Sequence, residues 1–186
     1  MANIVGLCGS LRRGSFNAAL LRAAAALAPD GSRIDARTLH GVPLYDGDVE
    51  AAEGIPPAVT ALKDAVAAAD GLLLVTPEYN NGIPGVFKNA IDWMSRPPAD
   101  IAPVFGSKPV AVVGASPGGF GTQLAQNAWL PVLRTLGTAP WFGGRLMVAR
   151  ANRVFDDGGR ILDAGVEERL RDFVARFCAH VDGAGS

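Results

Sequence analysis

Several residue types are scarce in this chain of 186 residues, and each scarcity argues against a class of protein. Two cysteines, Cys8 and Cys178, cannot form a disulfide framework, which indicates a reducing compartment. Two histidines, His40 and His180, lie far apart in the sequence, so we expect no metal site. The 17 Lys and Arg residues against 18 Asp and Glu residues give a net charge of −1, which provides no basic surface for nucleic acid or a membrane.

Long hydrophobic runs are also missing. The chain passes from Met1 directly into the apolar segment Ile4–Leu7, without the charged and then apolar regions of a signal peptide. The apolar run Ala23–Ala28 is far too short to cross a bilayer. We therefore expect a cytoplasmic protein. The length and the 49% of hydrophobic residues predict one globular domain over residues 1–186.

Short apolar segments alternate with longer helical ones along the chain. The predicted strands are Ile4–Leu7, Arg33–Leu39, Gly71–Thr76, Pro109–Ala115 and Trp141–Val148. The predicted helices are Asn17–Ala28, Pro56–Asp70, Pro84–Arg96, Thr122–Leu136 and Val166–Val181. Pro131 should kink or break the fourth helix, and we expect a loop at 40–57, where Gly and Pro interrupt every period. This alternation predicts an α/β fold with a parallel sheet.

Ligands of such sheets bind at the carboxyl ends of the strands, where this chain has three distinctive loops. The first loop, Gly9–Asn17, reads GSLRRGSFN and leads into a predicted helix. Its serine hydroxyls, its arginines Arg12 and Arg13 and the positive end of the helix suit a phosphate group. The alternative is that Ser15 is only a helix cap and that both arginines are solvated. The glycine spacing fits neither the Walker A loop nor the dinucleotide fingerprint.

The second and third loops are less specific. The second loop, Thr76–Gly85, places Tyr79 beside a carboxylate, so that a flat ring could stack there; the alternative is an ordinary turn before a helix. The third loop, Ala115–Thr122, has three glycines around Phe120, which would let a backbone approach a flat ligand closely. A glycine-rich turn needs no ligand, so this third signal alone is weak.

Together the three loops resemble the NAD(P)H-dependent FMN reductase family. The first loop is similar to the family's phosphate loop, G-S-L-R-x-x-S-x-N. Pro77–Trp93 is similar to its second signature, P-E-Y-N…P-G-x-x-K-N-A-I-D-W, and the third loop to its S-P-G-x-x-G segment. The resemblance extends from about Ile4 to Val181. It implies a flavodoxin-like, doubly wound five-stranded parallel sheet of strand order 2-1-3-4-5, with helices on both faces.

The resemblance also implies which residues bind FMN. The phosphate and ribityl end would be held by Ser10, Arg12, Ser15, Phe16 and Asn17. The isoalloxazine would lie beside Pro77, Glu78, Tyr79 and Asn80. Its other side would be lined by Ser116, Gly118, Gly119 and Phe120. One departure is Asn81, where many relatives carry an aromatic or small residue.

The implied activity is reduction of quinones, free flavin, azo compounds or chromate through bound FMN, with NADPH or NADH as electron donor. Because FMN carries the chemistry, we expect no catalytic side chain, and none of the three loops contains histidine. We interpret Glu78 as a loop anchor and Cys8 as a buried apolar residue. We expect a homodimer or homotetramer in which Gly41–Ile55 and Val86–Arg96 cover part of a neighbour's site.

Two other functions remain open at this point. A flavodoxin-type electron carrier would bind FMN without oxidising NAD(P)H, but such carriers are usually strongly acidic and this chain is nearly neutral. A nucleotide-binding module without redox chemistry would not need the apolar and aromatic residues of the strand-end loops.

Overall fold

The parallel sheet predicted from the alternating sequence is present in the computed structural model, which describes residues 1–184. Its strands are β1 (Asn3–Cys8), β2 (Arg33–Arg37), β3 (Gly71–Val75), β4 (Pro109–Ala115), β5 (Ala139–Pro140) and β6 (Met147–Val148). The order is β2-β1-β3-β4-β5, β6 also pairs with β4, and each of these pairings is parallel. The predicted strand order and the flavodoxin-like fold are confirmed.

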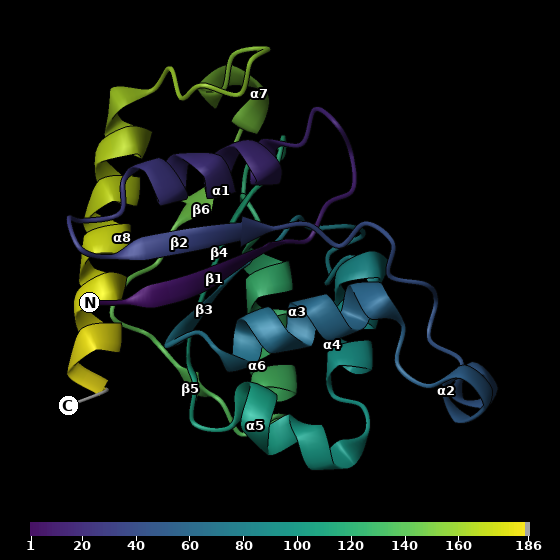
Figure 1. Ribbon diagram of the computed structural model, residues 1–186. Helices are drawn as coiled ribbons and strands as arrows, with labels where there is room; N and C mark the ends of the chain where they lie inside the picture. The colour runs from purple at the N-terminus through teal and green to yellow at the C-terminus, as the bar shows by residue number, and fades with distance from the viewer. Residues whose placement is uncertain (185–186) are drawn as a thin grey trace.

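Helices cover both faces of the sheet (Figure 1). The five predicted helices are α1 (Phe16–Ala26), α3 (Pro57–Ala67), α4 (Gly85–Met94), α6 (Gln123–Thr135) and α8 (Ala164–Ala184). Shorter ones are α2 (Gly47–Glu53), α5 (Ile101–Phe105), α7 (Ala151–Val154) and the 3-10 turn Pro98–Asp100. Within residues 1–184, no helix combines the length and apolar character needed to cross a membrane.

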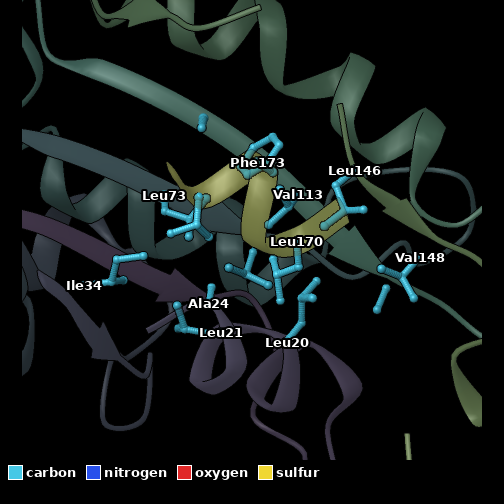
Figure 2. Close-up of a cluster of buried hydrophobic side chains, with 14 of the residues drawn as sticks. Leu20, Leu21, Ala24, Ile34, Leu73, Val113, Leu146, Val148, Leu170 and Phe173 are labelled. Carbon is cyan, nitrogen blue, oxygen red and sulfur yellow. The ribbon is translucent and has the colours of Figure 1, made fainter. Parts of the chain in front are cut away.

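The central strands divide their side chains between two cores. On β3, Leu73 and Val75 face α1 and α8, whereas Leu72 and Leu74 face α3 to α6. Figure 2 shows the first core, where Leu20 of α1 and Phe173 of α8 meet the sheet. Burying one such leucine contributes roughly 1.5–3 kcal/mol. The rigid sheet that results holds the strand-end loops at one edge, opposite the chain termini in Figure 1.

The predicted strand Trp141–Val148 is confirmed only at its end, where β6 lies. The edge of the sheet carries two short strands, β5 and β6, and the segment 141–146 between them leaves β4. The ring of Trp141 packs edge-on against Phe173 of α8, with centroids 5.1 Å apart. It also folds over the next glycines, since a Cβ at Gly143 would lie 2.5 Å from Trp141 Nε1. Packing of this partly buried ring, permitted by the two consecutive glycines, outweighs continuous strand pairing.

Two smaller expectations are also corrected. Helix α6 continues through Pro131, which is exposed, so the backbone carbonyl that loses its donor can be hydrated. The expected loop at 40–57 contains helix α2. Its first turn is capped by Asp46, whose Oδ1 accepts the Asp48 N–H at 2.9 Å.

Candidate functional site

The first loop ends in a capped helix N-terminus. Ser15 Oγ accepts the N–H groups of Asn17 and Ala18, both at 3.2 Å, which leaves its own hydroxyl proton to donate. Within residues 1–184, the N–H groups of Gly14 and Phe16 have no hydrogen-bond acceptor. Ser15 is therefore a helix cap, as the alternative held. The cap also leaves donors at the positive end of α1, where an anion is stabilised.

The two arginines of this loop differ in their contacts. Both are exposed, and neither forms an ion pair within the part of the chain that the structure describes. The guanidinium carbon of Arg12 lies 5.3 Å from the centroid of the Phe16 ring, a cation–π contact that holds it beside the start of α1. The Arg12 N–H also donates to Ser10 Oγ at 3.3 Å. Arg12 is thus positioned for an anion at the helix end.

Asn17 joins the first loop to the third. Its Nδ2 donates to the carbonyl of Ala115 at 2.8 Å, and its Oδ1 accepts the Ala115 N–H at 2.9 Å. The side chain is buried, so this pair fixes the start of α1 against the end of β4. The main role of the Asn17 side chain is to hold the two loops together. One of its amide hydrogens is left for a ligand.

The second loop is tied down by its carboxylate. Glu78 Oε2 accepts the N–H groups of Leu124 and Ala125 at 2.8 and 2.9 Å, and so caps α6. This confirms the interpretation of Glu78 as a loop anchor. The next residues form a tight turn in which Asn80 and Asn81 have φ of 50° and 63°, and Tyr79 and Gly82 exchange backbone hydrogen bonds. Tyr79 is half exposed at the base of this turn.

The third loop is held by its backbone. Ser116 donates its hydroxyl to the Gly121 carbonyl, and its N–H to the Val148 carbonyl at 3.0 Å. The Gly118 carbonyl accepts the N–H of Arg150 at 3.0 Å. Phe120 at the tip of the loop is 81% exposed. The loop is therefore rigid at its base and presents an aromatic ring to solvent.

The three loops meet around one cleft of about 300 Å³. Nine of the predicted residues line it: Ser10, Arg12, Ser15, Phe16, Asn17, Pro77, Glu78, Tyr79 and Ser116. Four others lie on the outer parts of the loops and do not line this cleft: Asn80, Gly118, Gly119 and Phe120. Ala115 and Pro117 also line the cleft, and sequence reasoning missed them because small apolar residues carry no chemical signal.

The donor set of the cleft fits FMN. The first loop contributes the buried hydroxyls of Ser10 and Ser15, the Arg12 guanidinium and the free N–H groups of a helix end, which suit a phosphate monoester. The second loop contributes Pro77 and Tyr79, which suit the flat apolar face of a ring. Phosphate donors and apolar side chains in one cleft are what a mononucleotide with a large ring requires.

The cysteines and histidines of the chain lie elsewhere. Cys8 is buried beneath the first loop, and burial raises the pKa of its thiol, which makes it a poor nucleophile. His40 is exposed after β2, and His180 lies on α8 against Trp141. The residues that line the cleft include neither histidine nor cysteine. The side chains present thus suit a cleft that binds and orients a cofactor.

A parallel sheet of this order, with a cleft at its carboxyl edge that suits a mononucleotide, defines the flavodoxin-like class of proteins. The chain belongs to the NADPH-dependent FMN reductase family, whose model matches residues 2–153. It is 44% identical over 168 residues to an NAD(P)H-dependent FMN reductase of Pseudomonas aeruginosa, covering 90% of this chain and 89% of that protein.

Two further matches agree. A 2-hydroxy-1,4-benzoquinone reductase from Burkholderia sp is 38% identical over 178 residues, 96% of this chain and 95% of that protein. The solved structure of FerB, a flavoenzyme NAD(P)H:(acceptor) oxidoreductase from Paracoccus denitrificans, superposes with a TM-score of 0.85 at 32% identity over 99% of both chains. Family membership confirms the prediction of an oxidoreductase that uses FMN and NAD(P)H, and supports it over the electron carrier.

Proposed function

We propose that this protein binds FMN noncovalently in the three-loop cleft and uses NAD(P)H to reduce quinones or similar acceptors in the cytoplasm. The observation that carries the proposal is the cleft itself, which is lined by phosphate donors of the first loop and apolar side chains of the second. Relatives named as FMN reductase and benzoquinone reductase support flavin and quinone acceptors. We include azo compounds and chromate because of the resemblance to the family. We treat residues 1–186 as a single FMN-binding domain.

The side chains of the cleft bind and orient, and they do not transfer protons. Ser10, Arg12 and Ser15 would hold the phosphate, each hydrogen bond to a charged group contributing roughly 1.5–3 kcal/mol. Pro77 and Tyr79 would exclude water from one side of the ring. Glu78 is occupied as the cap of α6, so it keeps the second loop in place. Bound FMN would supply the redox chemistry by accepting a hydride and passing on two electrons.

Donor and acceptor would use the same opening of the cleft in turn, which predicts ping-pong kinetics. The test is anaerobic rapid mixing of the FMN-loaded protein, first with NADPH and then with a quinone. Flavin absorbance should disappear with NADPH and return with the quinone. A flavin that stays oxidised with both NADPH and NADH would show an electron carrier instead. Intersecting initial-velocity patterns under all conditions would contradict a shared opening.

The cofactor should be FMN and not FAD, because the first loop serves one terminal phosphate and the sequence has no second glycine-rich loop typical of an adenylate site. The purified protein should be yellow, and acid should release stoichiometric FMN. Stoichiometric FAD after acid release, or no uptake of FMN on titration, would contradict this assignment.

We also propose a homodimer, or a tetramer made of two dimers, in which the carboxyl edge meets a neighbour. Leu44 and Phe120 at this edge are 83% and 81% exposed. The loop around Leu44 is fixed to its own α4: Tyr45 N–H donates to Asn89 Oδ1 at 2.9 Å, and Trp93 Nε1 donates to the Pro43 carbonyl at 2.9 Å. Leu44 is therefore held outward between two anchored residues, which suits an interface. Sedimentation of a fully active monomer at micromolar concentration would contradict the proposal.

A further inference from the structure

A second cavity lies beside the first loop, between α1 and the turn that precedes α8. Its volume is about 380 Å³. It shares Arg12, Ser15 and Phe16 with the three-loop cleft, so the two spaces adjoin across the first loop. We call it the arginine cavity because Arg12, Arg13 and Arg22 all line it.

These three arginines have no ion-pair partner within residues 1–184, whereas Arg96 and Arg171 pair with Glu50 and Glu167. Unpaired guanidinium groups that face one space favour an anion there.

The opposite wall of the arginine cavity is the glycine turn before α8. Gly159 has a φ of 82°, and a Cβ on it would lie 2.7 Å from Arg22 Nη2. The guanidinium of Arg22 therefore rests directly against the backbone of this turn. A side chain at Gly159 would displace it, so the glycine leaves the space that Arg22 occupies.

Two carboxylates also line the cavity. Asp156 is neutralised by Arg160, since its Oδ1 accepts the Arg160 N–H at 2.8 Å and its Oδ2 accepts Arg160 Nε at 3.2 Å. This contact also holds the pKa of Asp156 below its ordinary value. Asp157 is the remaining acidic group of the lining. The three free arginines outnumber it, so the cavity is positively charged overall.

We propose that the arginine cavity binds the 2′-phosphate of NADPH and so sets the preference of the enzyme for NADPH over NADH. The inference rests on the proposed function. FMN carries one phosphate, which the helix end with Ser15 and Arg12 satisfies, and this leaves Arg13 and Arg22 for a second one. NADPH differs from NADH only in its 2′-phosphate, and guanidinium groups match phosphate geometry. A dinucleotide with its nicotinamide in the cleft can extend across the first loop through the residues that the two cavities share.

The test uses FMN-loaded protein with Arg22→Ala and Arg13→Ala, and Arg134→Ala as the matched control. Arg134 is also exposed and without an ion pair in the described chain, but it lies on α6 and lines neither the cleft nor the arginine cavity. The kcat/KM of NADPH relative to that of NADH should fall about 10-fold or more in Arg22→Ala, and also in Arg13→Ala. It should stay at the wild-type value in Arg134→Ala.

A binding measurement tests the same site without turnover. By calorimetry, wild-type protein loaded with FMN should bind 2′,5′-ADP more tightly than 5′-ADP, and Arg22→Ala should remove this difference. Equal affinities of the wild type for 2′,5′-ADP and 5′-ADP would overturn the inference. An unchanged ratio of the kcat/KM of NADPH to that of NADH in both variants would also overturn it. So would a loss of FMN affinity in Arg22→Ala as large as in Arg12→Ala, because the cavity would then serve the FMN phosphate. If neither donor were oxidised, the proposed function would fail, and calorimetry would still decide the phosphate site.

Discussion

The first and second loops lie at the same edge of the sheet but use their charged side chains in opposite ways. In the first loop, Arg12 and Arg13 have no carboxylate partner within residues 1–184, and Arg12 is held beside a capped helix end. In the second loop, both hydrogen bonds of Glu78 go to the N-terminus of α6. The first loop therefore keeps its charged groups free for a ligand, whereas the second uses its carboxylate to shape the cleft. The charge of a loop residue does not show whether it is free for a ligand or anchors its loop, whereas its hydrogen bonds do.

The largest effect should come from breaking the contact that holds the binding loop against the sheet. Asn17→Ala leaves the buried N–H and carbonyl of Ala115 without partners, which should lower the free energy of unfolding by about 2–4 kcal/mol. For a chain of this size the melting temperature should fall by roughly 5–15 °C. Thermal unfolding followed by circular dichroism measures this, and an unchanged melting temperature would show that Asn17 does not join the loops.

Removing the binding charge itself should affect the cofactor and not the fold. Arg12→Ala should weaken FMN binding on the order of 10–100-fold, because a charge-assisted contact to the phosphate is lost. The affinity for riboflavin, which has no phosphate, should fall less. Activity should return with excess FMN. Fluorescence titration measures both flavins.

Arg13→Ala is the control for that titration. Its side chain does not line the three-loop cleft, so the affinity of this variant for FMN should change by less than about threefold. Equal weakening of FMN and riboflavin by Arg12→Ala would place that side chain away from the phosphate.

The second loop gives the opposite expectation. Glu78→Gln keeps an oxygen for the N–H groups of Leu124 and Ala125 but removes the charge at the start of α6. Stability should fall by only about 0.5–1 kcal/mol, and kcat with saturating FMN should stay within about threefold. Urea unfolding and steady-state kinetics measure the two quantities. A large fall in kcat with unchanged stability would make Glu78 a proton donor and remove the contrast between the loops.

The smallest effect concerns the thiol beneath the first loop. Burial raises the pKa of Cys8 and of Cys178, so the folded state retains their protons more strongly than the unfolded chain does. A raised pKa stabilises the fold below the ordinary cysteine pKa of about 8.5, and this contribution is lost as the pH rises above that value. Urea unfolding should show that the free energy of unfolding of the wild type decreases between pH of about 7 and about 9.5. The decrease should be smaller for Cys8→Ala. Identical decreases would contradict a buried neutral thiol.

Much of the fold could be predicted because apolar runs bounded by Gly and Pro mark the central strands. Two elements could not, since they also depend on residues far away in sequence. Helix α2 has a local cap in Asp46, but its Glu50 carboxylate also pairs with Arg96 at 2.9 Å. The fifth strand is divided because Trp141 packs against α8. Neither Arg96 nor α8 can be recognised as a partner from a local pattern.

For the site, the motifs identified the loops but not the part that each residue plays. Asn17 and Ala115 are 98 residues apart, and their mutual hydrogen bonds appear only in the fold. In the same way, Asn89 and Trp93 of the second signature read as ordinary helix residues, although they fix the loop that carries Leu44. Local sequence indicates which chemistry is present, while three-dimensional contacts decide which groups remain free for a ligand.

The central claim is that the capped end of α1, and not another helix end, receives the phosphate of FMN. A crystal structure of the protein with FMN bound tests it most directly. The account predicts a phosphate within hydrogen-bond distance of Ser15 Oγ and of the Arg12 guanidinium, with the ring toward Tyr79. A phosphate found in the arginine cavity against Arg22, or a flavin bound away from the first loop, would contradict it.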